Sequence, residues 1–164
     1  MEWLERTFAY ALDLHWWQQL GLAFLLGSFT VATLSDLKRL SAQREFVEIW
    51  LLFILGALLF DLYDLHKERI TGATFGVKWG LIAILSLLSF GRIGLLFRLA
   101  LADVAALAAA ASLLTPTPIL ILYGIAKVFS LLVERFVYKN QPSYPFMPVV
   151  SLATLCVLGL ALLV

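Results

Sequence analysis

Long apolar runs recur along nearly the whole chain, and they constrain its fold more than any other feature. Of the 164 residues, 62% are hydrophobic and 14% are charged, whereas a soluble domain carries about 25% charged residues. Each run is continuous and close to the ~20 residues that a helix needs to cross a bilayer. A β-barrel would instead show alternation over ~10 residues. The pattern predicts an all-α polytopic membrane protein, built as a single transmembrane domain over residues 1–164.

The apolar runs predict about six transmembrane helices joined by brief connections. Residues 1–13 carry more acidic than basic side chains and several aromatic ones. They are typical of a short interfacial segment rather than of a cleavable signal peptide. The connections leave no room for a separate soluble domain. The predicted spans are Leu14–Ser35, Phe46–Tyr63, Phe75–Phe90, Ile93–Leu114, Pro118–Val137 and Pro145–Val164.

Lysine and arginine residues are spread unevenly between the connections, which predicts an orientation. The positive-inside rule places the more basic side in the cytoplasm and both termini outside. The net charge of +1, without a basic cluster interleaved with aromatic residues, gives no indication of a nucleic-acid partner. The basic residues of the predicted cytoplasmic side are Lys38, Arg39, Arg44, Arg92, Arg98, Arg135 and Lys139. The outer side holds Arg6, Lys67, Arg69 and Lys78, partly offset by Asp61, Asp64 and Glu68, with Lys78 expected to snorkel toward the headgroups.

Two aspartates, Asp36 and Asp103, lie at the end of one apolar run and inside another. A carboxylate within a membrane span is costly and is by default a functional-site hypothesis. In the predicted topology both lie toward the cytoplasmic face. A helix that began at Ile93 would place Asp103 ~15 Å deep. The depths of the two carboxyls therefore match only if that helix begins later or if Asp36 is drawn inward.

Two carboxyls that meet in this way have the chemistry of an aspartic protease. The ionised carboxyl takes a proton from water, while the protonated one hydrogen-bonds the carbonyl oxygen of the substrate. Small residues surround Asp103, with Ala100 and Ala102 before it and a run of alanines after it. They would let another helix or an extended substrate approach closely.

Each aspartate also has an ordinary structural interpretation. Asp36 is followed by Lys38 and Arg39 and is compatible with an interfacial residue of a charged loop. Asp103 has a possible partner in Lys127, which lies in the middle of the fifth predicted span. That pair would serve packing alone, or would form the buried relay of a small proton-coupled carrier.

The two aspartate contexts together resemble those of the prepilin peptidases, a family of membrane aspartic proteases, and in particular their archaeal preflagellin-peptidase branch. Asp36 matches the family's first aspartate, which ends the first helix and precedes a basic stretch, here Leu37-Lys38-Arg39. Asp103 stands where the family's Gly-x-Gly-Asp motif ends, and the residues here are Ala100-Leu101-Ala102-Asp103. A Pro-Phe-Met-Pro run at 145–148 is similar to the start of that family's final helix.

The chain departs from the family pattern at three places. Both motif glycines are alanines, and the lysine that usually follows the second aspartate by two residues is Ala105. The Ile-Pro pair that often follows the first aspartate is replaced by residues 41–43, Ser-Ala-Gln. Lys127 is a candidate to supply the missing positive charge. The departures also support an alternative, a catalytically inactive relative that acts as a membrane scaffold or assembly factor.

The resemblance implies an endopeptidase that removes the short basic leader of prepilin- or prearchaellin-like substrates at the cytoplasmic face of a prokaryotic plasma membrane. Glu45 and Glu48 are candidates to contact the basic leader, although solvated charges at a helix start are the ordinary interpretation. Relatives that also methylate the new N-terminus carry an additional cytoplasmic domain with a cysteine cluster. This chain has neither that domain nor that cluster, since Cys156 is its single cysteine, and we therefore expect no methyltransferase activity and no zinc site. We also expect no other metal and no cofactor.

Overall fold

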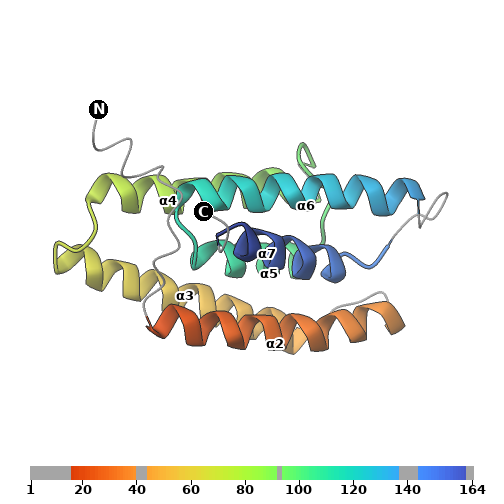
Figure 1. Cartoon of the computed structure of the whole chain (residues 1–164), viewed down its shortest axis with the longest axis horizontal. Coiled ribbons are helices and arrows are strands. Elements are labelled where there is room, and N and C mark those ends of the chain that lie inside the picture. The colour runs from red at the N-terminus through yellow and green to blue at the C-terminus, as the bar shows by residue number, and fades with distance from the viewer. Residues whose placement is uncertain (1–15, 40–43, 92–93, 137–143, 162–164) are drawn as a thin grey trace.

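The computed structural model describes residues 16–39, 44–91, 94–136 and 144–161. In these residues the protein is all-α, with six helices in the predicted order (Figure 1). The predicted interfacial segment 1–13 lies outside the described residues. The helices are α2 (Trp16–Arg39), α3 (Arg44–His66), α4 (Gly72–Ser89), α5 (Leu101–Ser112), α6 (Pro116–Phe136) and α7 (Met147–Ala161).

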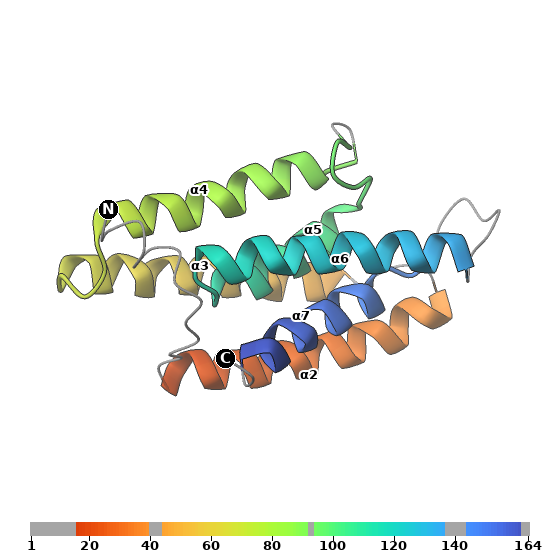
Figure 2. The same cartoon turned by 45° about the horizontal axis from the view of Figure 1, so that its top comes forward.

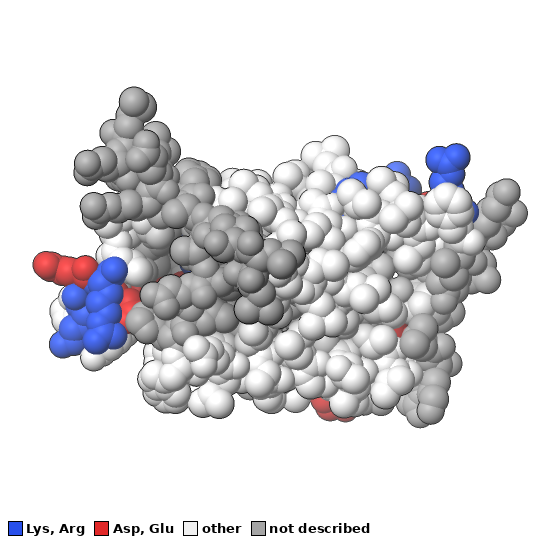
Figure 3. Space-filling view, in the orientation of Figure 1, with Lys and Arg blue, Asp and Glu red and all other residues white. Residues whose placement is uncertain are grey.

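Four of these helices, α2, α3, α4 and α6, are long and apolar enough to cross a membrane. Helices α5 and α7 are apolar but shorter, with 12 and 15 residues. On the face seen in Figure 3, most coloured charges lie toward the two ends, and the white surface between them is interrupted by a red patch at its lower edge. The polytopic helical fold predicted from the apolar runs is confirmed, while two of the six predicted spans are shorter than expected.

The fourth predicted span differs most from the structure, because α5 begins at Leu101 rather than at Ile93. The preceding segment, residues 94–100, is not helical, and at Leu99 it pairs with Phe90 at the end of α4 in a parallel bridge. The Leu99 N–H donates to the Ser89 carbonyl at 3.0 Å, and the Gly91 N–H donates to the Leu99 carbonyl at 3.1 Å. Gly94 has a φ of 52°, a backbone conformation that glycine adopts without a steric cost. A glycine turn and a short backbone pairing therefore replace the first turns of the predicted helix.

The other boundaries differ less. Helix α4 begins at Gly72, three residues before the predicted Phe75, because Thr71 caps it and accepts the Thr74 N–H at 3.2 Å. Helix α7 begins at Met147, after the two residues Pro145 and Phe146 that were predicted to open it. Residues 162–164 lie outside the described part of the chain.

Helix α5 forms the centre of the molecule, and every other described helix packs against it (Figures 1 and 2). All nine residues from Val104 to Ser112 are buried, and six of them are alanines. Alanine has little side chain beyond its backbone, so the surrounding helices approach α5 closely. The close approach expected around Asp103 is thus observed, and it positions the N-terminus of α5 among the ends of its neighbours.

Candidate active site

Asp36 lies near the end of α2 and is buried, with 6% of its surface exposed. Its Oδ2 accepts a hydrogen bond from the backbone N–H of Met147, the first residue of α7, at 3.2 Å. One turn earlier, the Thr33 and Ser151 hydroxyls are 3.1 Å apart and join the same two helices. The first N–H groups of a helix have no partner within it, and a carboxylate there also interacts favourably with the helix dipole. Asp36 therefore caps α7 from a distant part of the sequence.

Asp103 is the third residue of α5 and lies in its first turn. The backbone N–H of Ala100 hydrogen-bonds its carboxylate. Ala100 is the N-cap residue of α5, and its carbonyl accepts the Val104 N–H at 3.2 Å. An acidic side chain that reaches back to the N-cap N–H in this way is half of a capping box. Asp103 therefore caps the helix to which it belongs.

The two carboxylates are close enough for the charge of Asp36 to act on Asp103. They come from α2 and α5, which are in contact, and both of these helices contact α7. The late start of α5 makes this approach possible, since it places Asp103 at the helix end instead of several turns inside. The structure thus brings the two sequence-predicted aspartates together, at the point where α5 and α7 both begin.

Tyr144 is a neighbour of the pair that was not predicted from the sequence. It precedes α7, and its hydroxyl hydrogen-bonds the Ser130 hydroxyl on α6. Burial raises the pKa of the Tyr144 phenol above its ordinary value, the Ser130 hydrogen bond acts the other way, and the charges of Glu134 and Asp103 raise it further. The phenol therefore keeps its proton at neutral pH and provides a hydroxyl near Asp103.

Lys127 lies on α6, and its ammonium points to the segment that leads into α5. The Nζ atom donates to the Leu96 carbonyl at 2.6 Å and stands 5.1 Å from the centre of the Phe97 ring. Its described contacts are thus with the backbone and ring of this segment. Its predicted role as the positive charge beside the two aspartates, and its alternative role in a relay with Asp103, remain predictions.

The other predicted site residues belong to segments at the same end of the bundle. Ala100 is exposed and Ala102 half-buried, so two small side chains precede Asp103 at the start of α5. Glu45 and Glu48 are exposed on the first turns of α3. The side chains of the remaining predicted residues, Lys38 and Arg39, lie outside the described part of the structure.

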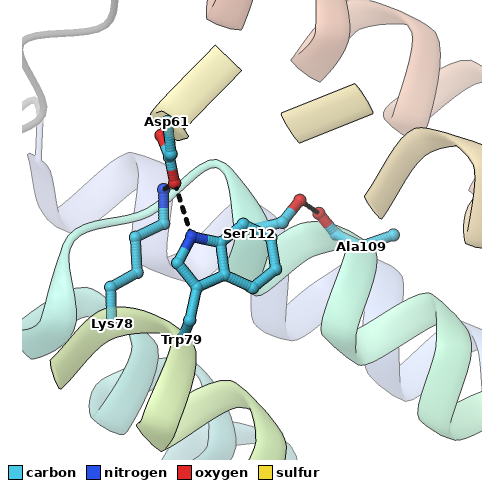
Figure 4. A network of polar contacts seen from close by, with 5 residues as sticks. All are labelled: Asp61, Lys78, Trp79, Ala109 and Ser112. Atoms are coloured by element: carbon cyan, nitrogen blue, oxygen red, sulfur yellow. Dashed lines mark hydrogen bonds and ion pairs between the residues drawn. The ribbon is translucent and has the colours of Figure 1, made fainter. Parts of the chain in front are cut away.

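A second polar cluster joins α3 to α4 (Figure 4). The Lys78 Nζ lies 2.7 Å from the Asp61 Oδ2, and the Trp79 indole N–H donates to the same oxygen at 2.9 Å. Both charged residues are buried, with 6% and 7% of their surfaces exposed. The expectation that Lys78 snorkels toward the headgroups is wrong, because an acidic partner on the neighbouring helix holds its ammonium inside the protein. Nearby, Arg69 forms an ion pair with Asp64 at 3.3 Å.

The arrangement of Asp36 and Asp103 allows acid–base chemistry on a water molecule. Two carboxyls that interact in a water-poor region share a proton more readily than they both ionise, so one serves as base and the other as acid. A comparison of the chain with protein-family models, with curated proteins and with solved structures finds no match.

Proposed function

We propose that the protein is a membrane-embedded aspartic endopeptidase with Asp36 and Asp103 as its catalytic pair. The observation that supports this most is the electrostatic interaction of these two carboxylates, which come from distant parts of the sequence. Each is held by a backbone N–H at the start of a helix, Asp36 at α7 and Asp103 at α5. Carboxyls fixed in this way keep their relative position without the flexibility of a loop.

The proposed mechanism uses one proton shared by the pair. The ionised carboxylate removes a proton from water, whose oxygen attacks the carbonyl carbon of the scissile amide. The protonated carboxyl hydrogen-bonds the carbonyl oxygen and stabilises the tetrahedral intermediate. The pair, which now holds two protons, gives one to the leaving nitrogen as the C–N bond breaks, and so again holds one proton. The proposal assigns the two roles to the pair and not to one residue each.

The proposed substrates are prepilin- or prearchaellin-like proteins, cut between a short basic leader and a hydrophobic helix at the cytoplasmic face of a prokaryotic plasma membrane. The resemblance of the two aspartate contexts supports this class. The leader's lysines and arginines would stay at the headgroups while the helix lies in the bilayer. Glu45 and Glu48, exposed on the first turns of α3, are the proposed contacts for the basic leader. The proposal includes no methyltransferase activity.

One observation favours a second candidate, an inactive relative with a scaffolding role. Both carboxylates already have a structural task, since each accepts a backbone N–H that its helix cannot satisfy. Capping alone is sufficient reason for an acidic or amide side chain at both positions. The two candidates differ in what an amide does there: asparagine keeps the cap but abolishes the acid–base chemistry.

The test compares the wild-type protein with Asp36→Asn and Asp103→Asn in liposomes, on a panel of prepilin-like peptides. We expect either single change to lower the cleavage rate at least about 100-fold, the lower end of what general acid–base catalysis contributes. Thermal unfolding should change little, because asparagine also accepts a capping N–H. Asp64→Asn, which removes the acidic partner of Arg69 on α3, is the control and should cut normally.

The pH profile of the wild-type rate provides a second criterion. A pair that needs one ionised and one protonated carboxyl gives a bell-shaped profile. Cleavage that survives both asparagine changes would contradict the proposal. Stable, well-folded protein without cleavage of any panel member would favour the scaffold.

A further inference from the structure

We infer that Lys127 is a positioning residue that ties the N-termini of α5 and α7 to one another and so fixes both carboxylates. The link to catalysis rests on the proposed function. The anchoring itself rests on contacts of three segments: α6, residues 94–100, and residues 144–147.

The first contact leads from Lys127 to Asp103. The Lys127 ammonium donates to the Leu96 carbonyl at 2.6 Å. Four residues later, the Ala100 N–H hydrogen-bonds the Asp103 carboxylate. The intervening backbone is not helical, so it has no internal hydrogen-bond ladder to fix its path. The tether at Leu96 therefore helps to determine where α5 begins.

The second contact leads from Lys127 to Asp36. The same ammonium lies over the face of Phe97, 5.1 Å from the ring centre. Phe97 meets Phe146 in an edge-to-face contact with ring centres 5.7 Å apart, and both rings are buried. Phe146 directly precedes Met147, whose N–H binds the Asp36 carboxylate. One cation thus contacts the chain before α5 directly and the chain before α7 through a pair of rings.

The membrane explains why a lysine stands at this position. In a bilayer, backbone carbonyls released from a helix need partners inside the protein. The late start of α5 releases such groups: the Leu96 N–H finds the Leu88 carbonyl at 3.0 Å, and the Leu96 carbonyl finds Lys127. An ammonium supplies three donors together with a charge that the Phe97 ring attracts. A neutral apolar residue of the same length supplies neither.

The experiment combines a spectroscopic probe with cleavage kinetics in the full chain. 4-Fluorophenylalanine is placed at Phe97 by site-specific incorporation, and the fluorine NMR resonance is recorded for wild type, Lys127→Met and Lys127→Arg. Lys67→Met is the matched control, because Lys67, which follows the end of α3, also lies over a ring, that of Tyr63 at 5.7 Å.

We expect one sharp resonance in wild type, Lys127→Arg and Lys67→Met, and a shifted or broadened one in Lys127→Met. In the cleavage assay, Lys127→Met should lower kcat on the order of 10- to 100-fold, the range expected when catalytic groups are misplaced by about 1 Å. KM should stay within about twofold of the wild-type value, and Lys127→Arg should restore kcat. If Lys127→Met does not fold, Lys127→Gln, which keeps a donor for Leu96 but has no charge, takes its place.

A Lys127→Met resonance identical to that of wild type would overturn the anchoring role, and so would an equal change in Lys67→Met. The fluorine measurement does not depend on activity, so the two proposals fail separately. A changed resonance in Lys127→Met, together with a wild-type protein that cuts no peptide, would refute the endopeptidase and retain the anchor. Normal cleavage with an unaltered resonance would do the reverse.

Discussion

The buried Lys78 ammonium is balanced by the Asp61 carboxylate, whose Oδ2 lies 2.7 Å from the Lys78 Nζ. Removing two charges from water is expensive, and their attraction offsets this cost only with good geometry and further hydrogen bonds. The Trp79 indole N–H supplies such a bond to the same carboxylate oxygen. The three residues therefore act as a unit. The loss of one leaves a buried charge or a buried N–H without its partner.

We expect Lys78→Met to lower the free energy of unfolding by about 3–5 kcal/mol, because it leaves the Asp61 carboxylate buried without a cation. The double variant Asp61→Asn/Lys78→Met should recover most of that loss, since asparagine carries no charge and still accepts the Trp79 N–H. Reversible unfolding in detergent measures both. A double variant as unstable as the single one would show that the pair is not coupled.

The partnership of Asp61 with Lys78 was missed because both residues were assigned to an outer, solvated side. Their spacing from the turn between α3 and α4 could have predicted the pair. Asp61 lies five residues before the end of α3, and Lys78 lies six residues after the start of α4. In two helices joined by a short turn, residues at similar distances from the turn lie at similar depth. Opposite charges placed in this way predict an ion pair.

At the scale of the elements, α5 combines the smallest side chains with the most complete burial. Its alanines from Ala108 to Ala111 are at most 7% exposed, and the helix is contacted by all the other described helices. Such an interface tolerates little added volume, because packed interiors respond to single methylene groups. The alanine run is therefore a packing requirement of the whole bundle as well as a feature of the site.

Ala109→Leu should destabilise the protein by about 1–3 kcal/mol, the usual cost of overpacking. Ala83→Leu is the matched control on the exposed face of α4 and should be neutral within about 0.5 kcal/mol. Thermal unfolding of the two variants in the same detergent compares them directly. If the Ala109→Leu and Ala83→Leu variants were equally stable, tight packing around α5 would be contradicted.

The ends of a helix could be predicted where the hydropathy of the sequence changes. They could not be predicted inside a continuous apolar run. Charged or proline-containing boundaries located α2, α3, α4 and α6 to within a few residues. The start of α5 lies inside an unbroken apolar run, and what sets it is backbone pairing between Leu99 and the end of α4. The approach of Asp36 to Asp103 depends on the late start of α5 and on the packing of α7 against α2. Both are contacts between distant residues, so local sequence patterns do not predict them. Tyr144 was missed for the same reason.

At the scale of the whole molecule, two polar clusters stand apart within an apolar bundle. The pair of Asp36 and Asp103 lies where α2 ends, and the pair of Asp61 and Lys78 lies near the turn between α3 and α4. Between them run helices that are long and apolar enough to cross a bilayer. If the proposed orientation holds, the first cluster faces the cytoplasm and the second the outside.

The orientation is testable with single cysteines in a Cys156→Ala background. We expect Glu134→Cys to react with a membrane-impermeant maleimide only in inside-out vesicles, because it follows the positive-inside assignment of the α6 end. Lys67→Cys should react only in intact cells. The reverse pattern would place the aspartate pair on the outer face and would contradict a cytoplasmic substrate.

The hydrogen bond between Asp36 and Met147 joins residues 111 positions apart. During synthesis, the end of α2 enters the membrane long before the start of α7 leaves the ribosome. Until then Asp36 lacks its partner, and the pair with Asp103 has only one of its two supports. The protein is therefore expected to remain without a formed site through most of its own translation. Completion of the site at Asp36, in the first described helix, thus depends on synthesis of the last described helix.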